Sequence, residues 1–138
     1  MDFELSEEQT MLRDTVRDVL SKTYDVETLR KVTDTELGWS RDVWKSLADI
    51  GILGLTVPEE DGGAGAGPVE FASVMGEIGR ALAPEPYLDA ALVPGSLIVA
   101  TAEGDLREEL LGGLAGGELL LAFAHQEAGD RWPAAAVA

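Results

Sequence analysis

The sequence contains no cysteine, which excludes a disulfide framework, a cysteine nucleophile and any thiolate-bound metal. It also lacks the basic region and apolar run that begin a secretory signal, and its first residues read Met-Asp-Phe-Glu. No stretch of about 18 residues is free of charge, so a membrane-spanning helix is not expected. These absences predict a cytoplasmic protein with no membrane partner.

Basic residues are scarce. Ten Lys and Arg stand against 26 Asp and Glu, which gives a formal net charge of −16. Such a charge opposes binding to nucleic acid or to an anionic membrane surface, so neither partner is expected. Hydrophobic residues make up 46% of the 138 residues, enough for one sizeable core and too many for a chain kept disordered by its charge.

What is present is mostly helical periodicity. Apolar residues recur at three- and four-residue steps in six segments, which is the spacing of one helix face. The fifth segment contains Pro94, which predicts a kinked or split helix. The six segments cover residues 6–20, 26–32, 40–51, 67–82, 88–102 and 105–117.

Several helix ends are also marked. Ser6 with Gln9 and Asp105 with Glu108 have the spacing of a capping box. Ser40 is a candidate N-cap, and Gly51 can adopt the left-handed conformation that ends a helix. Within the helix between them, Trp44 shares the apolar stripe and is predicted to be a core residue.

Two segments between the helices read as connectors. Residues 51–58 are apolar, but Pro58 and two glycines argue against a central strand, so we expect a buried connector. Residues 62–67 form a glycine-rich loop before Pro68, which suits the first turn of a helix. Glycines there allow a phosphate cradle, but the spacing matches neither phosphate-binding fingerprint, which favours a tight structural connector.

The end of the chain carries the other candidate chemistry. Residues 119–124 are a short apolar run that predicts a strand. His125 and Glu127 would share a face of an extended segment, yet two ligands do not make a metal site, so a hydrogen-bonded histidine is the simpler interpretation. Trp132, beside Arg131, is a candidate for a site or an interface.

The sequence of residues 42–51 followed by that of residues 54–65 resembles the N-terminal helical domain of acyl-CoA dehydrogenases. Residues 6–20, 69–82 and 106–118 are similar to that family's first helix, its helix after the glycine loop and its leucine-rich helix. The resemblance implies an all-α fold: an N-terminal helical bundle at residues 1–118. Residues 119–138 would be the first strand and loop of a middle β-domain that is otherwise missing.

The resemblance further implies an FAD-dependent oxidoreductase of lipid metabolism, which introduces an α,β double bond into an acyl-CoA thioester. In this family the helical domain helps to form the acyl cavity, and the glutamate base comes from the C-terminal half. This chain then contains no catalytic residue and is expected to be inactive alone. Phe123, His125 and Gln126 are the expected flavin contacts, with Trp132 as a further candidate.

The last residues depart from the common family pattern. Gln126 stands where a threonine usually meets the flavin, and Ala128 where a proline is usual. This variant is similar to the small subunits of pimeloyl-CoA-type dehydrogenases, which pair with a related subunit. It implies a homo- or hetero-oligomer. The alternative is a non-catalytic helical subunit or interaction module that completes a partner dehydrogenase.

Overall fold

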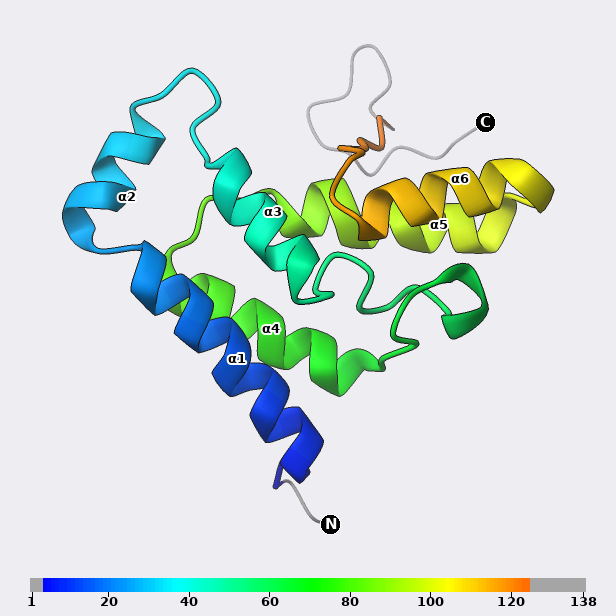
Figure 1. The fold of residues 1–138 in the computed structure, drawn as a ribbon, viewed down its shortest axis with the longest axis horizontal. Coiled ribbons are helices and arrows are strands. Elements are labelled where there is room, and N and C mark those ends of the chain that lie inside the picture. The colour runs from blue at the N-terminus through cyan, green and yellow to red at the C-terminus, as the bar shows by residue number, and fades with distance from the viewer. Residues whose placement is uncertain (1–3, 125–138) are drawn as a thin grey trace, which may run out of the picture.

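The computed structural model describes residues 4–124, and all regular structure in that range is helical (Figure 1). The helices are α1 (Glu7–Thr23), α2 (Val26–Thr33), α3 (Arg41–Asp49), α4 (Pro68–Ala81), α5 (Val93–Thr101) and α6 (Gly104–Ala115). A 3-10 turn, η1 (Glu59–Asp61), comes just before the glycine-rich loop, and a π-helical segment, η2 (Leu88–Leu92), leads directly into α5. The predicted all-α fold is confirmed. The fifth segment, predicted to be kinked or split at Pro94, is helical without a gap and changes from π- to α-helical geometry at Val93.

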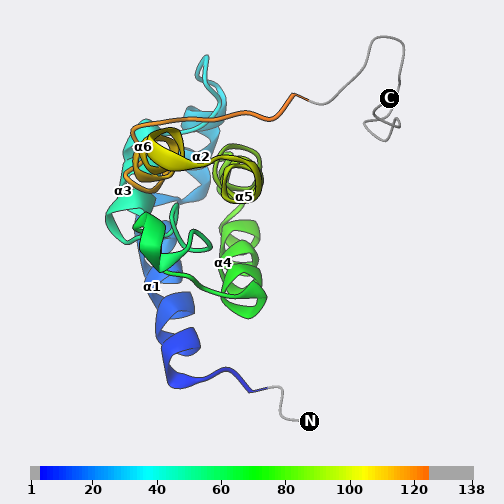
Figure 2. The ribbon, with the colours of Figure 1, turned by 90° about the vertical axis from the view of Figure 1, so that its right-hand side faces the viewer.

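Two helix pairs build the bundle. Helices α1 and α4 lie side by side, and α5 and α6 lie side by side at the other end of the molecule (Figures 1 and 2). Helix α3 contacts α1, and α6 contacts η1. The core between them includes Val16, Leu20, Trp44, Leu47, Ile52, Val74, Ile78, Leu111 and Leu114, all buried.

The caps at two helix starts are those read from the sequence. The Ser6 hydroxyl accepts from the amide of Gln9 at 3.1 Å, and the Gln9 side chain accepts from the amide of Ser6 at 2.9 Å. Ser40 accepts from the amide of Val43 and begins α3. Gly51 has φ 77° just past the end of α3, as predicted. Trp44 is 2% exposed, so its assignment to the core is confirmed.

The connector that follows α3 is also confirmed. Its apolar side chains Ile52, Leu53, Leu55 and Val57 are buried, and it forms no strand. A Cβ on Gly63 would lie 2.1 Å from the carbonyl oxygen of Val57, so the glycine loop can pack on the connector only with glycine at that position.

Three details of the predicted helices are wrong. Helix α6 begins at Gly104, one residue before Asp105, and no side chain caps it, because Gly104 has φ 60° and Glu103 occupies the N-cap position. Leu106 is 59% exposed, since its position in the first turn faces away from the core. Leu82 lies beyond the apolar face of α4, because it ends the helix at φ 52° and is 71% exposed.

The expected strand at residues 119–124 does not form. A strand needs a neighbour to satisfy its backbone groups, and residues 4–118 supply no strand with which it can pair. The segment instead runs back across α6 (Figure 2), with Leu119 against Gly113 and Leu121 against the core. The assignment of residues 119–138 to a middle β-domain stays a prediction. Among the helices described, none combines the length and apolarity that a bilayer span requires.

Candidate functional site

The predicted flavin contacts fall at the edge of the described structure. Phe123 lies in the segment after α6 and is 49% exposed. An aromatic side chain at such a position can contact a planar ring. His125, Gln126 and Trp132 lie outside the described residues.

The most distinctive surface is an apolar face of η2 and α5. Leu88 is 41% exposed, and Leu92, Val93 and Leu97 are only partly buried and do not pack against the core. We call these four residues the η2–α5 face. A helix of an ordinary surface type would carry polar side chains here. The face is therefore apolar surface that is only partly covered within the described part of the chain.

The helical spacing predicted this helix but did not by itself indicate the partly exposed apolar face. The signal was present, because residues 90–102 contain only Ser96 and Thr101 as polar side chains. A helix that is apolar all round is expected to be covered on every side. In this fold α5 packs against α6, and its Val93 and Leu97 stay only partly buried.

The N-terminal end of the face is fixed from behind by Tyr87. Its hydroxyl donates to the carbonyl of Ile52 at 3.1 Å, and its ring stacks on Phe71 with 6.3 Å between centroids. Burial raises the pKa of Tyr87 above its ordinary value, which keeps the hydroxyl protonated and able to donate. The start of η2 is therefore attached to the connector after α3.

The C-terminal end of the face is fixed by Arg107 of α6. Its guanidinium donates to Asp61 of η1 at 2.9 and 2.6 Å, and to the carbonyl of Val99 in α5 at 2.7 Å. The charged hydrogen bonds from Arg107 hold the pKa of Asp61 below its ordinary value. In the middle of α5, Gly95 lies so close to α6 that a Cβ there would be 3.0 Å from Leu114.

A buried carboxylate, Glu85, stands just before η2. One of its oxygens accepts from the Tyr24 hydroxyl and from the amide of Ser40, at 3.2 Å for the latter. Its other oxygen has no hydrogen-bond partner among residues 4–124. Glu85 thus ties the link between α4 and η2 to the ends of α1 and α3. No local pattern in the sequence indicates that Glu85 is buried.

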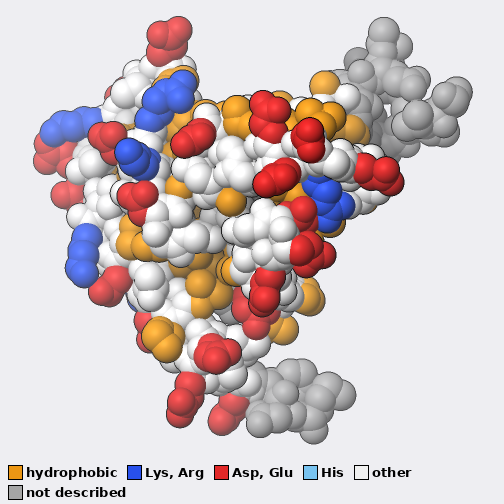
Figure 3. All heavy atoms as spheres, turned by 45° about the vertical axis from the view of Figure 1, so that its right-hand side comes forward, with side chains coloured by type: hydrophobic (Ala, Val, Ile, Leu, Met, Phe, Trp, Pro, Cys, Tyr) orange, Lys and Arg blue, Asp and Glu red, His pale blue; other side chains and the backbone are white. Residues whose placement is uncertain are grey.

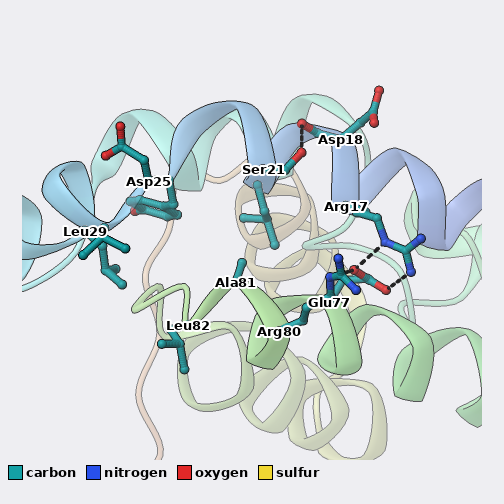
Figure 4. A pocket seen from close by; sticks show the side chains of 12 residues that line it. Arg17, Asp18, Ser21, Asp25, Leu29, Glu77, Arg80, Ala81 and Leu82 are labelled. Carbon is teal, nitrogen blue, oxygen red and sulfur yellow. Dashed lines mark hydrogen bonds and ion pairs between the residues drawn. The ribbon is translucent and has the colours of Figure 1, made fainter.

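A hollow of about 620 Å³ lies between the α1–α2 junction and the C-terminal end of α4 (Figure 4). At one end Arg17 donates to both oxygens of Glu77, at 2.7 and 3.0 Å, and Arg80 lies 3.8 Å from the same carboxylate. These charges are satisfied by each other. They serve to join α1 to α4 and leave no isolated charge to attract a ligand.

A second hollow, of about 470 Å³, lies beside the glycine loop and is lined only by Gly and Ala residues. No lysine, arginine or hydroxyl side chain lines it, so the geometry agrees with a structural connector and gives no support to a phosphate cradle. The described residues also contain no group of three His, Asp or Glu side chains placed to hold a metal ion. Acidic side chains spread over the part of the surface that carries α6 and η1 (Figure 3).

Comparison with known proteins agrees with this architecture. The acyl-CoA dehydrogenase IpdE2 of Mycobacterium tuberculosis is 35% identical over 117 residues, which cover 83% of this chain and 37% of that protein. The ChsE4-ChsE5 complex from Mycobacterium tuberculosis matches with a TM-score of 0.84 and 27% identity, over 94% of this chain and 36% of that one. The Tcur3481-Tcur3483 steroid ACAD matches with a TM-score of 0.75 and 25% identity, over 94% of this chain and 34% of that one.

The chain spans about a third of the length of these relatives. Residues 6–118 match the family described as acyl-CoA dehydrogenase, N-terminal domain. The helical order, the buried connector and the glycine loop all fall within that match. The chain therefore belongs to the acyl-CoA dehydrogenase family, of which it is the N-terminal helical domain.

Proposed function

We propose that the protein containing this chain is an FAD-dependent dehydrogenase of acyl-CoA thioesters, in which the η2–α5 face forms one wall of the acyl cavity. The observation that supports it is the face itself. Four partly or largely exposed aliphatic side chains lie on one helical segment whose two ends are fixed by hydrogen bonds from Tyr87 and Arg107. Because the helical domain of this family helps to form the acyl cavity, we assign the face to a wall of that cavity.

The wall would exclude water and orient the acyl group. Leu88, Leu92, Val93 and Leu97 carry no hydrogen-bonding group, so contact with them favours an apolar acyl chain or ring system. One solved relative is titled a steroid ACAD. On this basis the acyl group is proposed to be large, with several rings or a long chain.

FAD, when bound, supplies the acceptor for the hydride that leaves the acyl group. Phe123, which is partly exposed, is a proposed contact of the flavin ring, and His125, Gln126 and Trp132 are the further proposed contacts. The carboxylates that fix the wall are engaged elsewhere: Asp61 with Arg107 and Glu85 with Tyr24. Neither is available to remove an α-proton, so the base is proposed to come from another part of the protein.

The flavin proposal is tested on the whole protein that contains this chain. Its visible spectrum and FAD titration are compared with those of the His125→Ala and Gln126→Ala variants. Weaker FAD binding and a shifted flavin spectrum in the variants are expected. Unchanged affinity and spectra in both would refute these two contacts.

The wall is tested by enlarging its side chains. Leu92→Phe and Leu97→Phe should raise KM for the largest acyl-CoA thioesters and leave KM for the shortest ones unchanged. Met11→Phe is the matched control, because Met11 is an exposed apolar residue of α1, at 64%. Equal KM changes for all acyl lengths would refute the wall.

A second candidate is a non-catalytic subunit that completes a partner dehydrogenase. The solved relative ChsE4-ChsE5 is titled a complex of two differently named proteins, and Gln126 departs from the usual flavin-contacting threonine. We therefore propose assembly with a related subunit. Co-purification with that subunit, and a flavin that appears only in the assembly, would favour this candidate. A yellow, active protein without a different subunit would favour the first.

A further inference from the structure

We infer that Arg107 and Asp61 are positioning residues for the acyl site: together they fix the C-terminal end of α5 and so set the position of the η2–α5 face. This inference rests on the proposed function, because the face is assigned to the acyl cavity there. Neither residue needs to contact the substrate.

One guanidinium joins two consecutive helices, α5 and α6, to η1, which lies about 40 residues earlier in the sequence. Arg107 belongs to the first turn of α6, Asp61 closes η1 and Val99 lies in the last turn of α5. The donors are Nε and Nη2 toward Asp61, at 2.9 and 2.6 Å, and Nη1 toward the Val99 carbonyl, at 2.7 Å. The planar fork of arginine makes all three bonds possible at once.

The bond to Val99 does what a helix end requires. The last carbonyls of a helix have no partner within the helix, and a cation placed there also complements the helix dipole. In α5 the carbonyl of Ile98 accepts a hydrogen bond from the amide of Ala102, and the carbonyl of Val99 accepts one from Arg107. The C-terminal turn of α5 is thus capped from another helix, and Asp61 prevents the capping group from moving away.

The charge distribution makes this arrangement hard to replace. Arg107 is the only Lys or Arg between residues 81 and 130, where every other charged residue is Asp or Glu. Its side chain is 24% exposed and that of Asp61 is 10% exposed, so the pair is shielded from solvent more than a surface ion pair is. No neighbouring cation in that stretch can take over the role.

The η2–α5 face and the carbonyl of Val99, which Arg107 binds, lie on the same short helical segment. Leu97 is two residues from Val99, and Val93 is less than two turns from it. If the last turn of α5 is released, the helix keeps its attachment only at the Tyr87 end, and its C-terminal part can tilt or fray. Its apolar side chains would then leave the positions that a large acyl group needs.

The test uses the whole protein and a series of saturated acyl-CoA thioesters of increasing size. Arg107→Met removes all three donors and keeps the aliphatic stem, Asp61→Asn keeps the shape and removes the charge, and Arg107→Lys keeps the charge without the fork. Misplacing a positioned group by about 1 Å can cost up to about a hundredfold in rate. We expect Arg107→Met and Asp61→Asn to raise KM for the largest thioesters by roughly tenfold, with KM for the shortest ones unchanged and Arg107→Lys intermediate.

The chain offers a matched control in the pair Arg17 and Glu77. This pair has the same two-bond geometry, at 2.7 and 3.0 Å, and an equally buried carboxylate, but it joins α1 to α4 and does not contact α5. Arg17→Met and Glu77→Gln should lower the melting temperature about as much as the Arg107 and Asp61 variants. They should not change the dependence of KM on acyl size.

The inference would be overturned if the variants of both pairs lost the same stability and none of them changed KM for any thioester. It would also be overturned if they raised KM by the same factor for thioesters of every size. If the wild-type whole protein binds no flavin and oxidises no thioester, the proposed function fails by itself. Hydrogen exchange then decides the positioning role, because it needs no activity. Amides in the last turn of α5 must exchange faster in Arg107→Met than in Arg17→Met. Equal exchange rates in the two variants would refute the proposal that Arg107 fixes this turn.

Discussion

Replacing Gly63 by alanine should destabilise the chain strongly. The new Cβ would lie 2.1 Å from the carbonyl oxygen of Val57 and 2.4 Å from its Cβ, distances that real Cβ atoms do not adopt. Val57 is 2% exposed and cannot swing into solvent, so the loop must move instead. That movement would strain the bond from the amide of Gly65 to Val57, which is 2.8 Å long.

The magnitude follows from two contributions. Overpacking of a close-packed site costs about 1–3 kcal/mol, and weakening one backbone hydrogen bond costs about 1 kcal/mol. We expect Gly63→Ala to lower the free energy of unfolding by about 3 kcal/mol. Urea denaturation of the 138-residue chain, followed by circular dichroism, measures this directly.

A matched glycine gives the opposite expectation. Gly76 is inside α4 and has no other group within 4 Å of an added Cβ. Gly76→Ala should therefore stabilise the chain by about 0.5–1 kcal/mol, through the higher helix propensity of alanine. If Gly63→Ala unfolded at the same urea concentration as the parent, the packing of the loop on Val57 would be refuted.

Three further perturbations have clear expected outcomes. Trp44→Ala should lower the free energy of unfolding by about 3–5 kcal/mol, and an unchanged melting temperature would contradict its burial in the core. Leu82→Gly should raise the free energy of unfolding by about 1 kcal/mol, because it relieves a left-handed leucine at φ 52° that is largely exposed; a lower melting temperature would argue against that backbone conformation. Burial raises the pKa of Tyr24 and Tyr87 in the folded state. The stability that the two protonated hydroxyls contribute is therefore complete below about pH 10 and is lost as the pH rises above it. In alkaline titration the Tyr87→Phe variant should lose less stability than the parent.

Local sequence signals predicted most of the helical architecture. Ser6 and Ser40 marked helix starts because their side chains satisfy amides only three residues away. Such short-range bonds can be read from spacing alone. The buried connector was likewise readable, since Pro58 and the adjacent glycines oppose a strand while its apolar side chains require burial.

The contacts that build the candidate site are long-range, and spacing does not reveal them. Arg107 and Asp61 are 46 residues apart, and Tyr87 reaches Ile52 across 35 residues. The capping pattern at Asp105 misled for a related reason. Gly104 takes a left-handed conformation and starts α6 one residue early, a choice that depends on how α5 and α6 meet.

The link through Arg107 has a consequence for protein engineering. Exchange of short segments between related enzymes usually treats a surface loop and a distant helix as independent modules. Here a transplanted segment of η1 and the glycine loop that lacks an acid at position 61 would leave a partly buried guanidinium without its counter-ion, even if the segment itself folded correctly. Position 61 and position 107 must therefore be inherited from the same parent, and chimaeras that separate them should be recovered less often from a recombination library than those that keep them together.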